Sequence, residues 1–150
     1  MTDFRNSDRC ILDSKPVAQI IWERIKPFMP ENLYPEHKSM GINERFRFLR
    51  YDQGMFFKPH FDGVYVVPNS EPLQETKVTL QLYLNEGFKG GSTTFMGSDK
   101  NVECVPKIGK ALLFEHEILH EGSLLEEGRK YAVRTDLLYE EIEQDFNQKK

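Results

Sequence analysis

The chain has 150 residues, which is the usual length of one folded domain and too short for two ordinary cores. Twenty Lys and Arg against 24 Asp and Glu give a formal net charge of −4, which argues against a broad phosphate-binding surface but not against one small basic pocket. No stretch reaches the roughly 18 consecutive apolar residues of a membrane span, and the first residues lack the apolar core of a signal peptide. We therefore predict a single domain over residues 1–150 that binds neither nucleic acid nor membrane.

The two cysteines, Cys10 and Cys104, are too few for a disulfide framework or a four-cysteine zinc site. They are typical of a reduced protein, so we expect an intracellular, cytoplasmic location. Aromatic residues are abundant, with 11 Phe and 6 Tyr, whereas the chain has only 4 His. The positions of these few histidines therefore carry much of the functional information.

The first predicted elements are a short strand near residues 9–12 and one helix. Asp13 or Ser14 can cap the helix, and Pro16 falls in its first turn, where a missing N–H costs nothing. Apolar residues then repeat at helical spacing as far as Phe28. Residues 30–41 are predicted to form a polar connector.

After this connector, the apolar pattern changes to a period of two residues, which indicates strands. The predicted strands cover residues 45–51, 55–61, 64–67, 77–84, 93–96, 102–105, 111–116 and 131–139. Seven or eight short strands after one helix predict a mainly β fold, an antiparallel barrel or jelly roll. Residues 141–150 are predicted to be a polar tail or a frayed helical end.

The first candidate for chemistry is the triplet His60-Phe61-Asp62. On a strand, residues i and i+2 share a face, so the imidazole and the carboxylate point the same way, roughly 6–7 Å apart at their bases. One divalent cation can bridge this gap, although the triplet alone is also typical of a protein surface. An iron site with open coordination positions needs a second histidine from elsewhere.

His116 and His120 are the candidates for this second histidine. On one strand they would share a face but lie about 13 Å apart, so only one can join the site. The alternative is that both are exposed histidines among neighbouring glutamates.

A basic residue, Lys130, begins a later apolar strand on which Ala132, Arg134 and Asp136 share its face. A cation on the inner face needs a carboxylate partner, because desolvating an unpaired charge is costly. Two interpretations are open: Lys130 extends its head group into solvent at the strand edge, or it binds the carboxylate of a ligand.

These residues stand in one order along the chain, with His120 lying 60 residues after His60 and Lys130 following ten residues later. In this order, between about residues 43 and 139, the chain resembles the Fe(II)- and 2-oxoglutarate-dependent dioxygenases, most closely the prolyl 4-hydroxylase group. The motifs that carry the resemblance are Tyr51-X-X-Gly54, His60-X-Asp62, Tyr83-Leu84-Asn85, Gly90-Gly91-X-Thr93-X-Phe95, His120-X-Gly122 and Gly128-X-Lys130.

The resemblance implies a double-stranded β-helix, that is, a jelly-roll barrel, with Fe(II) held by His60, Asp62 and His120. Three ligands leave three positions, of which 2-oxoglutarate takes two and dioxygen the third. The distal carboxylate of 2-oxoglutarate is expected to pair with Lys130, which would satisfy the buried cation. No catalytic residue beyond the metal ligands is predicted.

Four further side chains are expected to bind the cosubstrate. The resemblance implies hydrogen bonds from the hydroxyls of Tyr51 and Tyr83, and Thr79 shares the face of Tyr83. Arg134 steadies a metal-bound carboxylate or grips substrate; the alternative is an outward salt bridge with Asp136 or Glu140.

The implied reaction is oxidative decarboxylation of 2-oxoglutarate to succinate and CO2, coupled to hydroxylation of a C–H bond, with ascorbate as a helper reductant. The expected substrate is a prolyl or other side chain of a peptide or protein. Small-molecule hydroxylation and a cupin-like metal-binding or sensing module without turnover are the alternatives. The net charge of −4 argues against nucleic-acid dealkylation.

Around this site, Phe57, Phe61 and Phe95 are expected to form apolar walls, and residues 66–76 a lid over the substrate. For the arginines at 45, 47 and 50, a solvated strand face is favoured over contact with an acidic partner. Relatives carry an N-terminal helical segment that supports the main sheet, whereas one helix precedes the barrel here. We therefore expect this support to be minimal or truncated.

Overall fold

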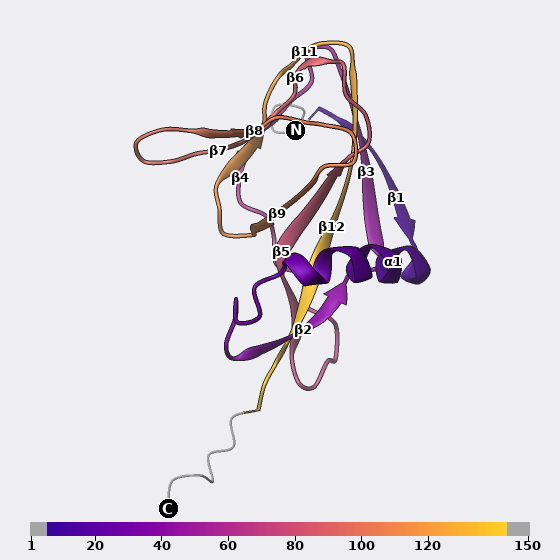
Figure 1. Ribbon diagram of the computed structural model, residues 1–150, viewed down its shortest axis with the longest axis vertical. Helices are drawn as coiled ribbons and strands as arrows, with labels where there is room; N and C mark the ends of the chain where they lie inside the picture. The colour runs from indigo at the N-terminus through magenta and orange to yellow at the C-terminus, as the bar shows by residue number, and fades with distance from the viewer. Residues whose placement is uncertain (1–5, 144–150) are drawn as a thin grey trace, which may run out of the picture.

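Two antiparallel sheets face each other in the computed structural model, which describes residues 6–143 (Figure 1). The major sheet has the strand order β1-β3-β12-β5-β9, with β2 paired to the far end of β12. Its strands are β1 (Asp8–Asp13), β2 (His37–Ile42), β3 (Arg45–Asp52), β5 (Gln74–Tyr83), β9 (Ala111–Glu115) and β12 (Arg129–Glu141).

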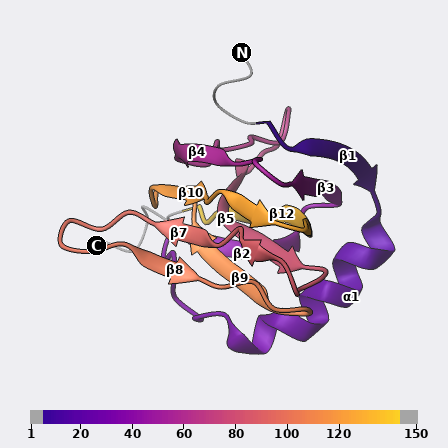
Figure 2. The ribbon, with the colours of Figure 1, turned by 90° about the horizontal axis from the view of Figure 1, so that it is seen from above.

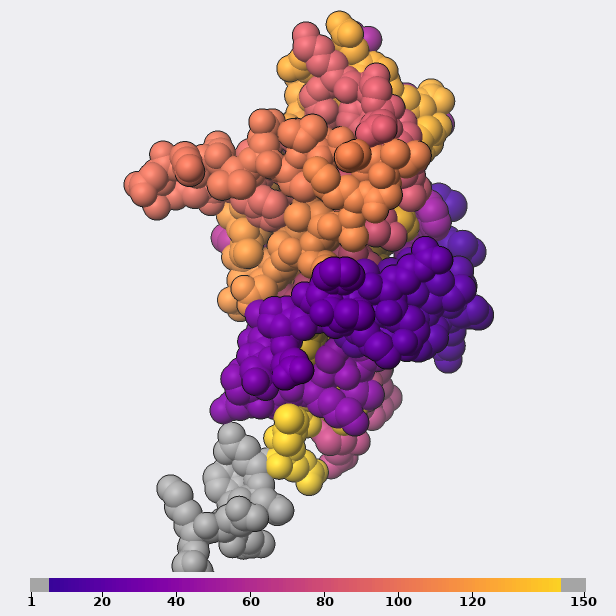
Figure 3. Space-filling model, in the orientation of Figure 1, coloured from indigo at the N-terminus to yellow at the C-terminus, as the bar shows by residue number. Residues whose placement is uncertain are grey.

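The minor sheet has the strand order β4-β10-β7-β8. Its strands are β4 (Phe57–His60), β7 (Thr93–Phe95), β8 (Val102–Cys104) and β10 (His120–Gly122), and a separate pair joins β6 (Lys89–Gly90) to β11 (Leu125–Glu127). The β7–β8 hairpin extends away from the body of the molecule (Figure 3). This arrangement confirms the predicted mainly β fold with one N-terminal helix and a jelly-roll barrel.

The helix α1 (Lys15–Ile25) begins as predicted, with Pro16 in its first turn. Ser14 provides the cap, because its Oγ accepts a hydrogen bond of 3.3 Å from the backbone N–H of Val17. The helix ends at Ile25 rather than near Phe28, and a short 3₁₀ helix, η1 (Lys26–Phe28), follows. Pro27 explains this end, since it has no N–H to continue the α-helical hydrogen bonds. No helix in the described part of the chain is long and apolar enough to cross a membrane.

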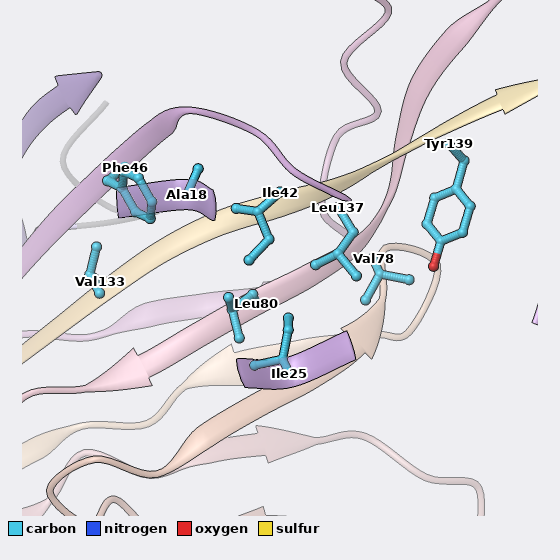
Figure 4. Packing of buried hydrophobic residues seen from close by; sticks show 9 residues of the cluster. All are labelled: Ala18, Ile25, Ile42, Phe46, Val78, Leu80, Val133, Leu137 and Tyr139. Carbon is cyan, nitrogen blue, oxygen red and sulfur yellow. The ribbon is translucent and has the colours of Figure 1, made fainter. Parts of the chain in front are cut away.

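The hydrophobic core lies between α1 and the major sheet, on the side away from the minor sheet (Figures 2 and 4). Alternation along β5 and β12 places Val78, Leu80, Val133 and Leu137 on this face. They pack with Ala18, Ile25, Ile42, Phe46 and Tyr139. Residues at the alternate positions of the same strands face the minor sheet instead.

Two predicted segments are wrong. The connector over residues 30–41 contains β2, whose polar residues pair with the end of β12; this pairing partner lies about 100 residues away and leaves no local apolar signal. The strand predicted at residues 64–67 is reduced to one isolated bridge, between Val66 and Glu75. Of residues 141–150, predicted to be a polar tail or a frayed helical end, Glu141 belongs to β12, and residues 144–150 lie outside the described residues.

Candidate metal centre

A cavity of about 280 Å³ lies between the two sheets. The major sheet lines it with residues of β1, β3, β5, β9 and β12, and the minor sheet with residues of β4, β7 and β10. The lining side chains of the major sheet come from the alternate positions that do not pack against α1. The cavity therefore opens on the polar face of the same sheet that carries the core.

The three predicted metal ligands meet in this cavity. His60 ends β4, His120 begins β10, and the two residues stand directly opposite each other in the antiparallel register. Asp62 follows β4, and its backbone N–H donates to the carbonyl of His116 at 3.0 Å. The potential ligand atoms of His60, Asp62 and His120 all lie within 4.8 Å of one another.

The two imidazole rings are oriented by backbone carbonyls. Nδ1 of His60 lies 2.6 Å from the carbonyl of Lys58, and Nδ1 of His120 lies 2.8 Å from that of Ile118. Because a carbonyl only accepts, each Nδ1 carries a proton, and Nε2 is the ring nitrogen that can bind a metal. Both Nε2 atoms lie 3.5 Å from Oδ1 of Asp62. Two imidazoles and one carboxylate aimed at a common point fit Fe(II) with open positions.

Aromatic rings hold the imidazoles in place. Phe57 stacks on His60 with ring centroids 3.8 Å apart, and Phe114 packs edge-on against His120 at 4.5 Å. Both phenylalanines line the cavity. Phe57 therefore forms a wall as expected, whereas Phe61 is 61% exposed and Phe95 contacts Phe114 from behind.

The carboxylate of Asp62 is held on both oxygens. The Thr79 hydroxyl donates to Oδ2 at 2.5 Å, and Arg134 lies 3.3 Å from Oδ1. Burial alone would raise the pKa of Asp62, but the imidazoles of His120 and His60, together with Arg134 and Thr79, hold it well below its usual range. The group is therefore an anion, as a metal ligand requires.

His116 lies beneath this carboxylate rather than on the surface. It is buried, its Nδ1 lies 2.9 Å from the Thr79 hydroxyl, and its Nε2 lies 3.0 Å from that of Thr76. Burial lowers its pKa, so the ring is neutral. Because Thr79 donates to Asp62, Thr79 accepts from Nδ1–H of His116, and Nε2 accepts from Thr76. The alternative of two exposed histidines is wrong: His120 joins the metal cluster and His116 supports it.

Arg134 points inward and connects two carboxylates. Besides Asp62, it lies 3.3 Å from Asp136, which a second arginine, Arg47, also contacts at 3.3 Å. Arg134 therefore steadies the carboxylate that binds the metal, as one interpretation predicts. It also pairs with Asp136, as the alternative predicts, but this pair lies inside the molecule and is not an outward salt bridge. Thr79, expected to bind the cosubstrate, lines the cavity and donates its hydroxyl hydrogen bond to Asp62.

Lys130 is the second residue of β12 and is 1% exposed. Its Nζ donates to the carbonyl of Gly91 at 2.6 Å and lies 4.7 Å from the ring centroid of Tyr51. Burial lowers its pKa to about 8. Within residues 6–143, no carboxylate lies within 4.0 Å of Nζ, so this buried cation fits an anionic ligand in the cavity.

Gly91 is needed for this contact. Its φ of +74° is a conformation that favours glycine, and a Cβ at this position would lie 3.2 Å from Cδ of Lys130. The second glycine of the motif Gly90-Gly91 thus brings its backbone carbonyl to the head group of Lys130.

The two predicted tyrosines differ in their surroundings. Tyr51 is buried and lines the cavity, whereas Tyr83 lies behind Thr93, with the two hydroxyl oxygens 2.6 Å apart. Thr93 itself lines the cavity. Thr93 belongs to the motif Gly90-Gly91-X-Thr93-X-Phe95 but was not predicted as a site residue; its spacing of two residues from Gly91 was the signal that could have found it.

The segment predicted to be a lid lies elsewhere. None of the described residues 66–76 lines the cavity. The backbone N–H of Val67 instead donates to Gln74, and that of Glu141, at the end of β12, donates to Leu73. This placement, at the end of the sheet near β2, does not support the predicted lid (Figure 1).

The arginines of β3 do not share one environment. Arg45 and Arg50 are exposed and pair with Asp13 and Asp8, as a solvated face predicts. Arg47 lines the cavity, as does Arg9 of β1, and neither was assigned to the site from the sequence. Alternation with Tyr51 on β3 was the signal that could have found Arg47.

Comparison with known proteins agrees with this site. A sequence profile described as the 2OG-Fe(II) oxygenase superfamily matches residues 46–135. A relative in Arabidopsis thaliana, named probable prolyl 4-hydroxylase 7, is 27% identical over 69% of this chain and 41% of its own length. The chain spans less than half the length of the two curated plant relatives that it matches: 24% of one protein and 41% of the other.

Solved structures show the same fold at low identity. The viral collagen prolyl hydroxylase of Paramecium bursaria chlorella virus-1, in complex with 2-oxoglutarate, matches with a TM-score of 0.63 and 19% identity, over 90% of this chain and 80% of its own. The prolyl hydroxylase of Trichoplax adhaerens, in complex with a hypoxia-inducible factor peptide, matches with a TM-score of 0.70 and 18% identity, over 94% and 66%. Since the profile covers most of the chain and includes all three ligands, this protein belongs to the 2OG-Fe(II) oxygenase superfamily.

Proposed function

We propose that this oxygenase hydroxylates a prolyl or other side chain of a peptide or protein, with release of succinate and CO2. The observation that carries the proposal is the pairing, in one cavity, of a His-Asp-His cluster with the buried cation of Lys130. The peptide substrate is supported by the names of the plant relatives and by the peptide bound to the Trichoplax neighbour.

Each part of the cavity has a role in this proposal. His60, Asp62 and His120 hold the metal, and Lys130 pairs with the distal carboxylate of 2-oxoglutarate. When bound, Fe(II) and 2-oxoglutarate would supply the electrons that activate dioxygen, which is the oxidant for the substrate C–H bond. Phe57 and Phe114 limit the access of water to the metal ligands, which protects this chemistry from side reactions.

The polar groups behind the metal ligands hold the carboxylate of Asp62 in one orientation before the metal or 2-oxoglutarate binds. Thr79 and Arg134 each hold one oxygen of Asp62, so the carboxylate does not rotate away from the imidazoles. Thr93 and Tyr51 line the cavity, and the ring of Tyr51 lies beside Lys130, so we assign both residues a contact with 2-oxoglutarate. We assign Tyr83 an indirect role, through its contact with Thr93.

We also propose ascorbate as the reductant that sustains turnover, and an intracellular, cytoplasmic location. The location is supported by the two cysteines, Cys10 and Cys104, which are both free thiols.

The proposal is tested by incubating a panel of proline-containing peptides with the protein, Fe(II), 2-oxoglutarate, ascorbate and dioxygen. We expect succinate release and a mass increase of one oxygen atom in at least one peptide, both lost when 2-oxoglutarate is omitted. The His120→Ala variant should lose both activities, whereas His37→Ala, far from the cavity, should keep them.

Two other outcomes would contradict the proposal in different ways. Succinate release with no oxidised peptide, but with an oxidised small molecule from a metabolite panel, would identify a small-molecule hydroxylase. Iron binding with no succinate release at all would identify a metal-binding or sensing module without turnover.

A further inference from the structure

The concave face of the major sheet continues past the metal centre onto its edge strand, β1. In the register, Arg9 stands opposite Leu49, and Leu49 stands opposite Ala132. Ala132 lies between Lys130 and Arg134 on the cavity face of β12, and both Arg9 and Leu49 line the cavity. A substrate that enters from this edge therefore passes Arg9 before it reaches the ligands.

The charges around the cavity are unbalanced. Four cations line it, Arg9, Arg47, Lys130 and Arg134, against two carboxylates, those of Asp62 and Glu121, which leaves a surplus of 4 − 2 = 2 positive charges. Fe(II) and doubly charged 2-oxoglutarate cancel each other, so their binding does not remove the surplus. In a chain whose net charge is −4, this cavity is locally positive.

Two of the four cations have no carboxylate partner among the described residues: Lys130, which 2-oxoglutarate is proposed to neutralise, and Arg9. The strands β1 and β3 carry four arginines, of which Arg45 lies 3.0 Å from Asp13, Arg50 lies 2.7 Å from Asp8 and Arg47 lies 3.3 Å from Asp136. Arg9 is exposed at the cavity mouth and has no carboxylate within 4.0 Å among the described residues. The surroundings therefore neutralise three of these arginines and leave Arg9 available.

We infer that Arg9 binds an acidic side chain of the peptide substrate, an inference that rests on the proposed function. Neighbouring strands lie about 4.8 Å apart, so β1 lies about 10 Å from β12, a distance that about three residues of an extended peptide span. The acidic residue is therefore expected about three positions from the hydroxylated residue. Ile11, 45% exposed and on the same face of β1, supplies an apolar contact beside Arg9.

The test uses the full chain with Mn(II) in place of Fe(II) and with 2-oxoglutarate, so that binding is measured without turnover. Fluorescent peptides carry one central proline and one Glu, placed two, three or four positions before or after it, and each has a matched peptide with Gln in place of Glu. Dissociation constants are measured by anisotropy for the wild type, Arg9→Gln and Arg50→Gln. Arg50 is the matched control, because it lies on the adjacent strand and pairs with Asp8.

We expect at least one Glu peptide to bind the wild type about fivefold more tightly than its Gln partner, which is what a partly exposed ion pair of about 1 kcal/mol provides. Arg9→Gln should remove this difference and leave the Gln peptide unchanged, and Arg50→Gln should change neither. Equal binding of all Glu and Gln partners, an equal loss for both in Arg9→Gln, or binding of no peptide would overturn the inference.

Failure of the proposed function is separable from failure of this inference. The same peptides are incubated with Fe(II) and dioxygen, and the oxidised products are counted. Oxidation without any charge preference would leave the proposed function standing and overturn the role of Arg9. Arg9-dependent binding of acidic peptides without oxidation would support the role of Arg9 and contradict the proposed function.

Discussion

The two faces of the major sheet carry opposite chemistry on the same strands. On β12, Val133 and Leu137 face α1 and belong to the hydrophobic core, whereas Lys130, Arg134 and Asp136 face the minor sheet. The apolar face is complete in itself, because α1 covers it and removes it from water. The polar face is incomplete, because the buried cation of Lys130 has no counter-ion among the described residues.

This difference indicates which face stabilises the fold and which face is built for ligands. Burying Lys130 without a carboxylate costs free energy, as its lowered pKa shows. A ligand that supplies the missing negative charge recovers this cost on binding. We therefore expect substitutions on the α1 face to affect stability, and substitutions on the cavity face to affect binding and turnover.

The largest effect is expected for Asp62→Ala, which removes a metal ligand. Iron affinity and succinate release should fall by more than about 100-fold, beyond the loss typical of groups that only support a ligand. Iron content after dialysis and succinate release measure the effect. Asp8→Ala, which removes an exposed carboxylate paired with Arg50, is the control and should change neither quantity. Equal iron content in Asp62→Ala and the wild type would show that the cluster is not the metal site.

The next effect is expected for Lys130→Met, which keeps the volume of the side chain and removes the charge. The affinity for 2-oxoglutarate should fall by about 100-fold, because the bound carboxylate would be left buried and unpaired. Iron affinity should stay unchanged, which separates the two subsites. Titration of 2-oxoglutarate into the iron-loaded, oxygen-free protein measures the effect. A parallel loss of iron would contradict the assigned role of Lys130.

The same variant should change how stability depends on pH. The pKa of Lys130 is about 8 in the folded protein against an ordinary 10.5, so between these values the unfolded chain binds more protons than the folded chain. The contribution of Lys130 to the free energy of unfolding therefore rises as the pH increases from about 8 to 10.5. Urea unfolding of the metal-free protein across this window should show the rise in the wild type relative to Lys130→Met. Identical pH profiles for the two proteins would contradict it.

On the opposite face, Leu80→Ala should lower the free energy of unfolding by about 3 kcal/mol, because Leu80 is completely buried in the core. The protein that remains folded should bind iron normally. Urea unfolding and iron content measure the two quantities, with Ile11→Ala, on an exposed strand, as a control of similar chemistry. If iron affinity in Leu80→Ala fell as far as in Asp62→Ala, the two faces would not be independent.

The smallest effect is expected for Thr79→Val, which removes the hydroxyl that joins Asp62 to His116. Metal affinity should fall by about tenfold, because Asp62 loses one of the contacts that orient it. Thr79→Ser keeps a hydroxyl and should restore the affinity. Metal titration of both variants, with their thermal unfolding as a check on stability, measures the effect. Equal affinities in the two variants would show that the hydroxyl does not position Asp62.

Most of this site was predictable from local patterns. The period of two along β5 and β12 separates the core residues from the cavity residues, since alternate side chains of a strand lie on opposite faces. The spacing within His60-X-Asp62 places both ligands on one side, and the role of Lys130 was implied by the family resemblance that the order of the motifs carries. The capping of α1 by Ser14 was equally local.

Pairing between strands that lie far apart in the sequence determined the remaining features of the site and of the fold. The turn after β9 buries His116 below Asp62 and lets β10 bring His120 opposite His60, a choice that strand spacing alone left open. The edge position of β1 places Arg9 at the cavity mouth, and β2 exists only because β12 is long enough to pair with it. The physical reason is that antiparallel register joins residues tens of positions apart, and no local periodicity encodes which strands become neighbours. Local pattern therefore assigned each side chain to a face, and the tertiary structure decided which of those side chains meet.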